Sequence, residues 1–128
     1  MILCDSNIFI EIFRKNLFIR SEFENIGHEN IMVSDVIKSE LFFGAKNKQE
    51  LQNIKKYLSN YSSFTIQPEI SKMAVDFIEN YCLSQRLTFP DALIAATAIY
   101  YNIPLFTLNA KDFKFIPNIK LYQIVVSG

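Results

Sequence analysis

The chain has 128 residues, the size of one ordinary domain, which leaves no room for a second large core. Half of the residues are hydrophobic, including 12 Phe and 6 Tyr, and this composition excludes an intrinsically disordered chain. The formal net charge is zero, so no global basic field attracts nucleic acid, and a polyanion would have to be held by a local patch or by metal ions.

The first predicted element is a short apolar strand, Ile2–Cys4, which ends at Asp5. Ser6 is the expected N-cap of a helix that runs to about Arg14. In an open parallel sheet the site lies outside the carboxyl ends of the strands. Asp5 is therefore the first candidate functional acid.

A second amphipathic helix is predicted around Leu17 to Ile26, ended by Gly27. His28 follows it, and a lone histidine at a helix end is usually structural or solvated. We assign it no function from the sequence.

A strand at Ile31–Val33 leads to Ser34, the expected N-cap of a helix from Asp35 to about Ala45. Glu40 shares one face of that helix with Val36 and Ile37, so a carboxylate stands in the apolar stripe. One interpretation is a core-edge acid paired with a lysine or arginine. The other is a metal ligand that reaches toward Asp5.

The middle of the chain predicts a helix from Lys46 to Asn60 with a solvated lysine face, a strand at Phe64–Ile66, and a helix opened by Pro68. The lysines of the first helix could also touch a phosphate backbone. Nothing in the helix after Pro68 indicates chemistry.

The segment Thr88–Tyr101 predicts a buried helix, with Pro90 at its first position and Asp91 in its first turn. The helix dipole favours an acid there whatever its role. However, Asp91 is the only charge on a helix too apolar to be solvated, which makes it a candidate for the same pocket as Asp5.

A strand at Ile103–Leu108 is followed by Asn109-Ala-Lys-Asp112, so an acid again lies close behind a strand. Asp112 is the fourth candidate, and the alternative is an ordinary turn aspartate. Leu121–Val126 is the expected last strand.

The alternation of strands and helices predicts a single α/β domain over residues 1–128. We expect a mainly parallel central sheet of about five strands, joined by right-handed crossovers, with helices on both faces. Acids from separate segments can then converge at one edge of the sheet.

Four motifs in this order resemble the PIN-domain family, and more closely the VapC ribonuclease toxins of bacterial type II toxin–antitoxin modules. They cover nearly the whole chain, from Met1 to about Tyr122, and their ordered set is more specific than any one of them. The motifs are Asp5-Ser-Asn7, Glu40 in Ser-Glu-Leu-Phe-Phe-Gly, Asp91 in Pro-Asp-Ala-Leu-Ile-Ala-Ala-Thr-Ala, and Thr107-Leu-Asn-Ala-Lys-Asp-Phe113.

The resemblance implies a PIN-like three-layer sandwich and an Mg²⁺- or Mn²⁺-dependent endoribonuclease that cleaves single-stranded regions of RNA. It gives the metal-binding roles to Asp5, Glu40 and Asp91. The fourth position is Asp112 or Asn109, because relatives differ there, and we favour Asp112. The resemblance also implies neutralisation by a VapB-like antitoxin, and a homodimer.

The chemistry of hard cations agrees with such a site, because Mg²⁺ prefers oxygen ligands and a metal-bound water can serve as the nucleophile. The expected hydrogen-bonding residues around the acids are Ser6, Asn7, Thr107 and Asn109. Candidate phosphate contacts are Arg14, Lys46, Arg86 and Lys111.

Two other classes stay open: an aspartyl-phosphate phosphotransferase that uses Asp5 as nucleophile, and a non-catalytic interaction module. Cys4 and Cys82 lie in apolar stretches and are expected to be buried thiols of a reducing cytosol. No signal peptide precedes Asp5 and no apolar run approaches about 20 residues, so we expect a cytoplasmic protein without a membrane segment.

Overall fold

The computed structural model describes residues 1–124, which form a four-stranded parallel sheet with helices on both faces. The strand order is β3-β2-β1-β4, so the first strand of the chain lies inside the sheet. The strands are β1 (Ile2–Cys4), β2 (Ile31–Ser34), β3 (Ser62–Phe64) and β4 (Leu105–Phe106).

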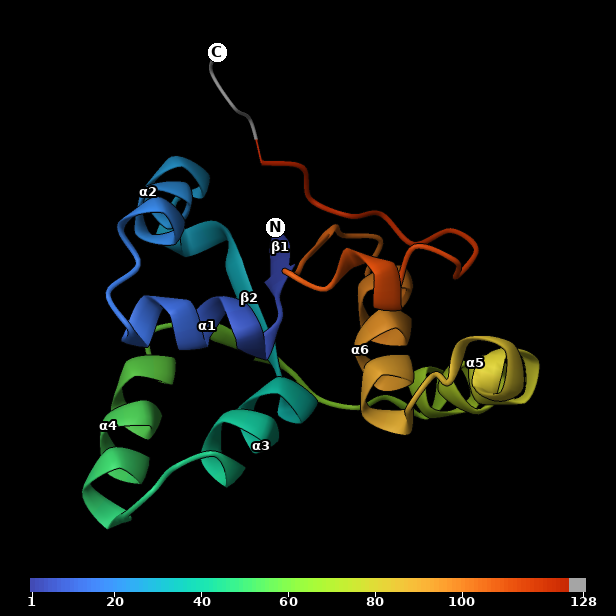
Figure 1. The fold of residues 1–128 in the computed structure, drawn as a ribbon, viewed down its shortest axis with the longest axis horizontal. Helices are drawn as coiled ribbons and strands as arrows, with labels where there is room; N and C mark the ends of the chain where they lie inside the picture. Colours follow the sequence, from blue (N-terminus) through green and yellow to red (C-terminus); the bar gives the residue numbers. More distant parts are fainter. Residues whose placement is uncertain (125–128) are drawn as a thin grey trace.

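Figure 1 shows α1, α2 and α4 on one side of β1 and β2, with α5 and α6 on the other. This arrangement confirms the predicted α/β class and the helices on both faces. The helices are α1 (Ser6–Phe13), α2 (Leu17–Ile26), α3 (Asp35–Phe43), α4 (Lys48–Leu58), α5 (Pro68–Gln85) and α6 (Phe89–Tyr100), and two 3-10 turns are η1 (His28–Asn30) and η2 (Ala110–Asp112).

The register of the sheet decides which side chains meet at its carboxyl edge. Cys4 of β1 lies opposite Phe106 of β4 in a parallel pair, and the Asp5 backbone N–H donates to the Phe106 carbonyl at 2.9 Å. The residues that follow the two strands, Asp5 and Thr107, are therefore neighbours although they are far apart in the sequence.

Two helices that follow strands begin at polar residues that cap them. Ser34 accepts a hydrogen bond from the Ile37 N–H at 3.3 Å, as predicted. The prediction for Ser6 was wrong by one residue, because the N-cap of α1 is Asp5, whose carboxylate accepts from the Ser6 N–H at 2.8 Å. The candidate acid thus stabilises the start of α1.

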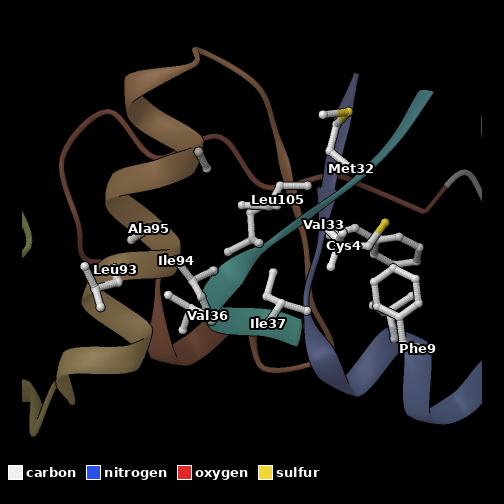
Figure 2. Packing of buried hydrophobic residues seen from close by; sticks show 14 of the residues in the cluster. Cys4, Phe9, Met32, Val33, Val36, Ile37, Leu93, Ile94, Ala95 and Leu105 are labelled. Atoms are coloured by element: carbon white, nitrogen blue, oxygen red, sulfur yellow. The ribbon is translucent and has the colours of Figure 1, made fainter. Parts of the chain in front are cut away.

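The core lies on both faces of the sheet, and Figure 2 shows Phe9 of α1 on one side of Cys4 and Val33, with Ile94 and Ala95 of α6 on the other. The helix α6 is buried along Ala92–Ala98, as its apolar sequence predicts. Inside it the Thr97 hydroxyl donates to the Leu93 carbonyl at 2.7 Å, so this buried polar group is satisfied.

The strand predictions need two corrections. The sheet has four strands and not about five, because Leu121 makes only an isolated parallel bridge with Leu105, and 125–126 lie outside the described residues. The third strand is Ser62–Phe64, two residues before the predicted Phe64–Ile66, because pairing with Met32–Ser34 of β2 sets its position.

Burial also corrects one cysteine. Cys4 is buried, but Cys82 is exposed, because it lies about 100° around α5 from the buried stripe that contains Ile70 and Ala74. The sequence does not indicate this exposure, because Cys82 stands between the apolar residues Tyr81 and Leu83. In residues 1–124 no helix is long and apolar enough to cross a membrane.

Candidate functional site

Asp5 stands at the centre of the site, at the carboxyl end of β1 and only 5% exposed. Its Oδ1 atom accepts from the Ser6 N–H at 2.8 Å, and its Oδ2 atom accepts from the Thr107 hydroxyl at 2.8 Å. Burial raises the pKa of Asp5, the two hydrogen bonds lower it, and the charge of Asp112 raises it further. The net effect is an increase, and within residues 1–124 no ion pair compensates the carboxylate.

A small hydrogen-bond network fixes the orientation of Thr107. The Thr107 oxygen accepts from the Asn7 amide at 3.2 Å and from the Asn109 N–H at 3.1 Å. Both acceptor positions of the hydroxyl are then in use, so its proton is directed to Asp5. The Asn7 amide oxygen accepts from the Leu108 N–H at 3.2 Å, which ties the start of α1 to the segment after β4.

Asp91 approaches the same region from the first turn of α6. It is partly buried, and its pKa rises from 3.8 to about 6 because of burial, and then because of the negative charges of Asp5 and Asp112. The three aspartates therefore lie within electrostatic reach of one another, although they come from different segments.

Glu40 completes the group from α3, but its position differs from the prediction. The buried residues of α3 are Val36, Ile37 and Leu41, and Glu40 lies at the edge of this stripe with an exposed side chain. Partial burial of its carboxyl group, followed by the charges of Asp5 and Asp91, raises its pKa to about 7. The interpretation as an acid paired with a lysine or arginine is wrong within the described residues, where the only ion pair joins Arg14 to Glu11.

Asp112 ends the 3-10 turn η2, and Asn109 is its N-cap residue. The charge of Asp112 acts on Asp5 and Asp91, whereas Asn109 contributes its backbone N–H to Thr107. Of the two candidates for the fourth position, Asp112 is the one that adds negative charge to the cluster.

The donor set fits a hydrated hard cation. Within residues 1–124, no group of three or more His, Cys, Asp or Glu side chains is gathered tightly enough to hold an ion by protein ligands alone. Mg²⁺ usually takes one or two carboxylates and keeps several waters, and such an ion would offset both the burial and the neighbouring negative charges that raise the three pKa values. The arrangement therefore fits an ion held partly through water.

The predicted phosphate contacts separate into two sets. Arg14 and Lys46 line a groove of about 730 Å³ that also contains Glu40, although Arg14 pairs with Glu11 at 3.4 Å. Arg86 is the exposed C-cap of α5, and Lys111 is exposed on η2 beside Asp112. Neither of these two lines the groove.

The sequence did not reveal the groove itself, because it forms where three helices approach one another. Its apolar wall includes Ile10 and Phe13 of α1 and Ile54 and Tyr57 of α4. Ile10 is 39% exposed and Phe13 is 37% exposed. This exposure depends on how α1 packs against α4, so the sequence carries no signal for it.

Comparison with known proteins defines the family. The chain matches the PIN domain model over residues 2–117 and belongs to the PIN domain family, which confirms the predicted family and fold. It is similar to the Ribonuclease VapC of Rickettsia bellii (strain RML369-C), at 29% identity over 132 residues that cover 96% of each protein.

Solved structures agree with this assignment. A chain of a toxin-antitoxin complex from Klebsiella pneumoniae is 30% identical, with a TM-score of 0.79, over 97% of this chain and 100% of the other. A chain of VapBC2 from Rickettsia felis, bound to a DNA fragment from its promoter, is 26% identical with a TM-score of 0.80, over 95% and 98% of the two chains.

Proposed function

We propose that this chain is a VapC-type toxin, a metal-dependent endoribonuclease that cleaves single-stranded regions of RNA. One observation carries the proposal: the charges of Asp5, Asp91 and Asp112 contribute to the raised pKa values of Asp5, Glu40 and Asp91, and within residues 1–124 no ion pair joins any of these four acids to a lysine or arginine. Carboxyl groups whose ionised forms are disfavoured by burial and by one another are typical of a functional site. The likeness to a ribonuclease VapC over 96% of the chain supports the choice of reaction.

Asp5 and Asp91 are the proposed central ligands of an Mg²⁺ or Mn²⁺ ion, because both are partly or fully buried at strand and helix ends. Glu40 and Asp112 would act at its flanks, directly or through water. The bound ion would supply a water of lowered pKa and stabilise the leaving 3′ oxygen. Thr107, with Asn7, would hold Asp5 in one orientation while the substrate binds.

The site disfavours the aspartyl-phosphate alternative. Such phosphotransferases usually carry a second acid two residues after the nucleophile, but this chain has Asn7 there, and the Asn7 amide donates to Thr107. A non-catalytic interaction module would not account for a cluster of acids with raised pKa values. We therefore retain hydrolysis by an activated water.

A VapB-like antitoxin is the proposed partner, because the similar structures include a toxin-antitoxin complex and VapBC2. The groove beside Glu40 offers an apolar wall and a mixed charged rim, which suit an amphipathic peptide segment that crosses the acids. We also expect a homodimer, which would cover exposed apolar residues of α5 such as Leu83 and Val75.

A nuclease assay tests the proposal. The purified chain is incubated with total cellular RNA and Mn²⁺, or with the same RNA and a chelator, and new 5′ ends are mapped. Cleavage at defined single-stranded positions that the chelator abolishes is the expected result. Cleavage that persists in chelator, or the absence of cleavage with Mn²⁺, would contradict the proposal.

A further inference from the structure

A second pocket of about 260 Å³ lies between α2 and the ends of α1 and α4, away from the clustered acids. Its lining includes Lys15, which follows α1, together with Arg20 and Glu24 of α2, His28 of η1 and Tyr57 of α4. None of these residues except Tyr57 lines the groove that contains Glu40.

The charges of this pocket favour an anion. Lys15 and Arg20 are the two basic side chains of the lining besides His28, and Glu24 is its single carboxylate. Throughout residues 1–124 the only ion pair joins Arg14 to Glu11, so neither Lys15 nor Arg20 is neutralised by a carboxylate within 4.0 Å. The groove differs, because its lining holds as many carboxylates, Glu40 and Glu50, as cations.

A hydrogen-bonded chain holds His28 at the rim of the pocket. The His28 Nδ1 atom lies 2.8 Å from the Tyr61 hydroxyl, which lies 3.0 Å from the Tyr57 hydroxyl. The imidazole also stacks on the Tyr61 ring, with centroids 5.9 Å apart and planes inclined by 20°. Because Nδ1 is engaged, Nε2 is the ring atom that remains for a ligand, and the exposed imidazole has a fixed orientation.

The pocket and the groove are adjacent, because Tyr57 lines both. Phe13 packs edge-on against Tyr57 with centroids 5.2 Å apart and is 37% exposed, so part of its ring is open to a base. The pocket that contains Lys15 and Arg20 therefore borders the groove that contains Glu40.

We infer that this pocket binds a backbone phosphate of the RNA strand, outside the site of cleavage. The inference rests on the proposed ribonuclease function and extends the substrate site to Lys15, Arg20 and His28. Two unpaired cations and an oriented imidazole supply the charge-assisted donors that a phosphate requires. An antitoxin segment in the groove would exclude RNA from the same path.

Binding of a fluorescent single-stranded RNA in chelator, measured by anisotropy at several salt concentrations, tests the inference. The chain is compared with the double variant Lys15→Gln/Arg20→Gln and with the control Lys120→Gln, an exposed lysine outside both cavities and outside α5. Loss of one phosphate contact lowers the slope of log Kd against log salt by about 0.7 for a single strand. We expect that decrease in the double variant alone, together with weaker binding at low salt.

An unchanged slope in the double variant would overturn the inference. A parallel titration with inorganic phosphate, followed by the His28 ring signals in NMR, separates the two sources of phosphate. A response of His28 to free phosphate with an unchanged RNA slope would assign the pocket to a small anion and overturn the RNA assignment. A reduced slope in a chain that never cleaves RNA with Mn²⁺ would instead uphold the pocket and reject the nuclease.

Discussion

Replacing Asp91 by Asn should stabilise the metal-free protein at pH 8. The pKa of Asp91 rises from 3.8 to about 6, which corresponds to about 3 kcal/mol, and solvent at the half-buried carboxyl reduces this to about 1–2 kcal/mol. For a chain of this size that gain raises Tm by about 4–8 °C. The amide keeps the shape of the side chain but removes a charge that is disfavoured by burial and repelled by Asp5 and Asp112.

The pH dependence follows from the direction of the pKa change. The folded state keeps the Asp91 proton to a higher pH than the unfolded chain does, so stability of the metal-free protein falls as pH rises from about 4 to about 6. The gain from Asp91→Asn should therefore be present at pH 8 and nearly absent at pH 4.

Thermal unfolding in chelator at pH 4 and pH 8, repeated with Mn²⁺ at pH 8, measures these effects. Glu29→Gln serves as the control, because Glu29 is an exposed acid of η1 that precedes β2, at the opposite edge of the sheet from the four acids. Mn²⁺ should stabilise the parent chain and the control, but hardly affect Asp91→Asn. A variant that is less stable than the parent at pH 8 in chelator would refute the electrostatic reasoning.

Three further predictions concern the same structure. Thr107→Val should lower RNA cleavage about 10- to 100-fold, because Asp5 loses its orienting hydrogen bond, and Thr107→Ser should restore most of it; equal rates for both variants would be contrary. Cleavage should be slower at pH 5.5 than at pH 7.5, since Glu40 with a pKa of about 7 is mostly protonated at the lower pH before metal binds; a flat rate profile would contradict this. Leu83→Glu should shift the protein from dimer to monomer in light scattering, because Leu83 is 95% exposed on α5; a monomeric parent chain would reject the homodimer.

Much of the fold could be predicted from local signals. The buried helix α6 follows from a run of alanine and aliphatic residues, and the place of Asp5 follows from the rule that parallel strands end at one edge. The position of β3 could not be predicted, because Ser62–Phe64 is short, largely exposed, and defined by its partner β2 and not by its own pattern.

The site could be predicted only in part for a similar reason. Acids at strand and helix ends are visible in the sequence, whereas cavities depend on how separate helices pack. The sequence predicts the helix that carries Glu40, but it does not show that Glu40 lies at the edge of the buried stripe and borders a groove. The sequence does not predict the hydrogen bond of His28, because its partner, Tyr61, is 33 residues away.

The most direct test of the shared acidic site is RNA cleavage by the parent chain and by Asp5→Asn at increasing Mn²⁺ concentration, with thermal unfolding of the same samples. Asp5 accepts hydrogen bonds from both Ser6 and Thr107, so Asn keeps its shape and part of its bonding. We predict that the variant stays folded but shows neither cleavage nor stabilisation by Mn²⁺. Cleavage by the folded variant at the parental rate would contradict the assignment of Asp5 to the metal site.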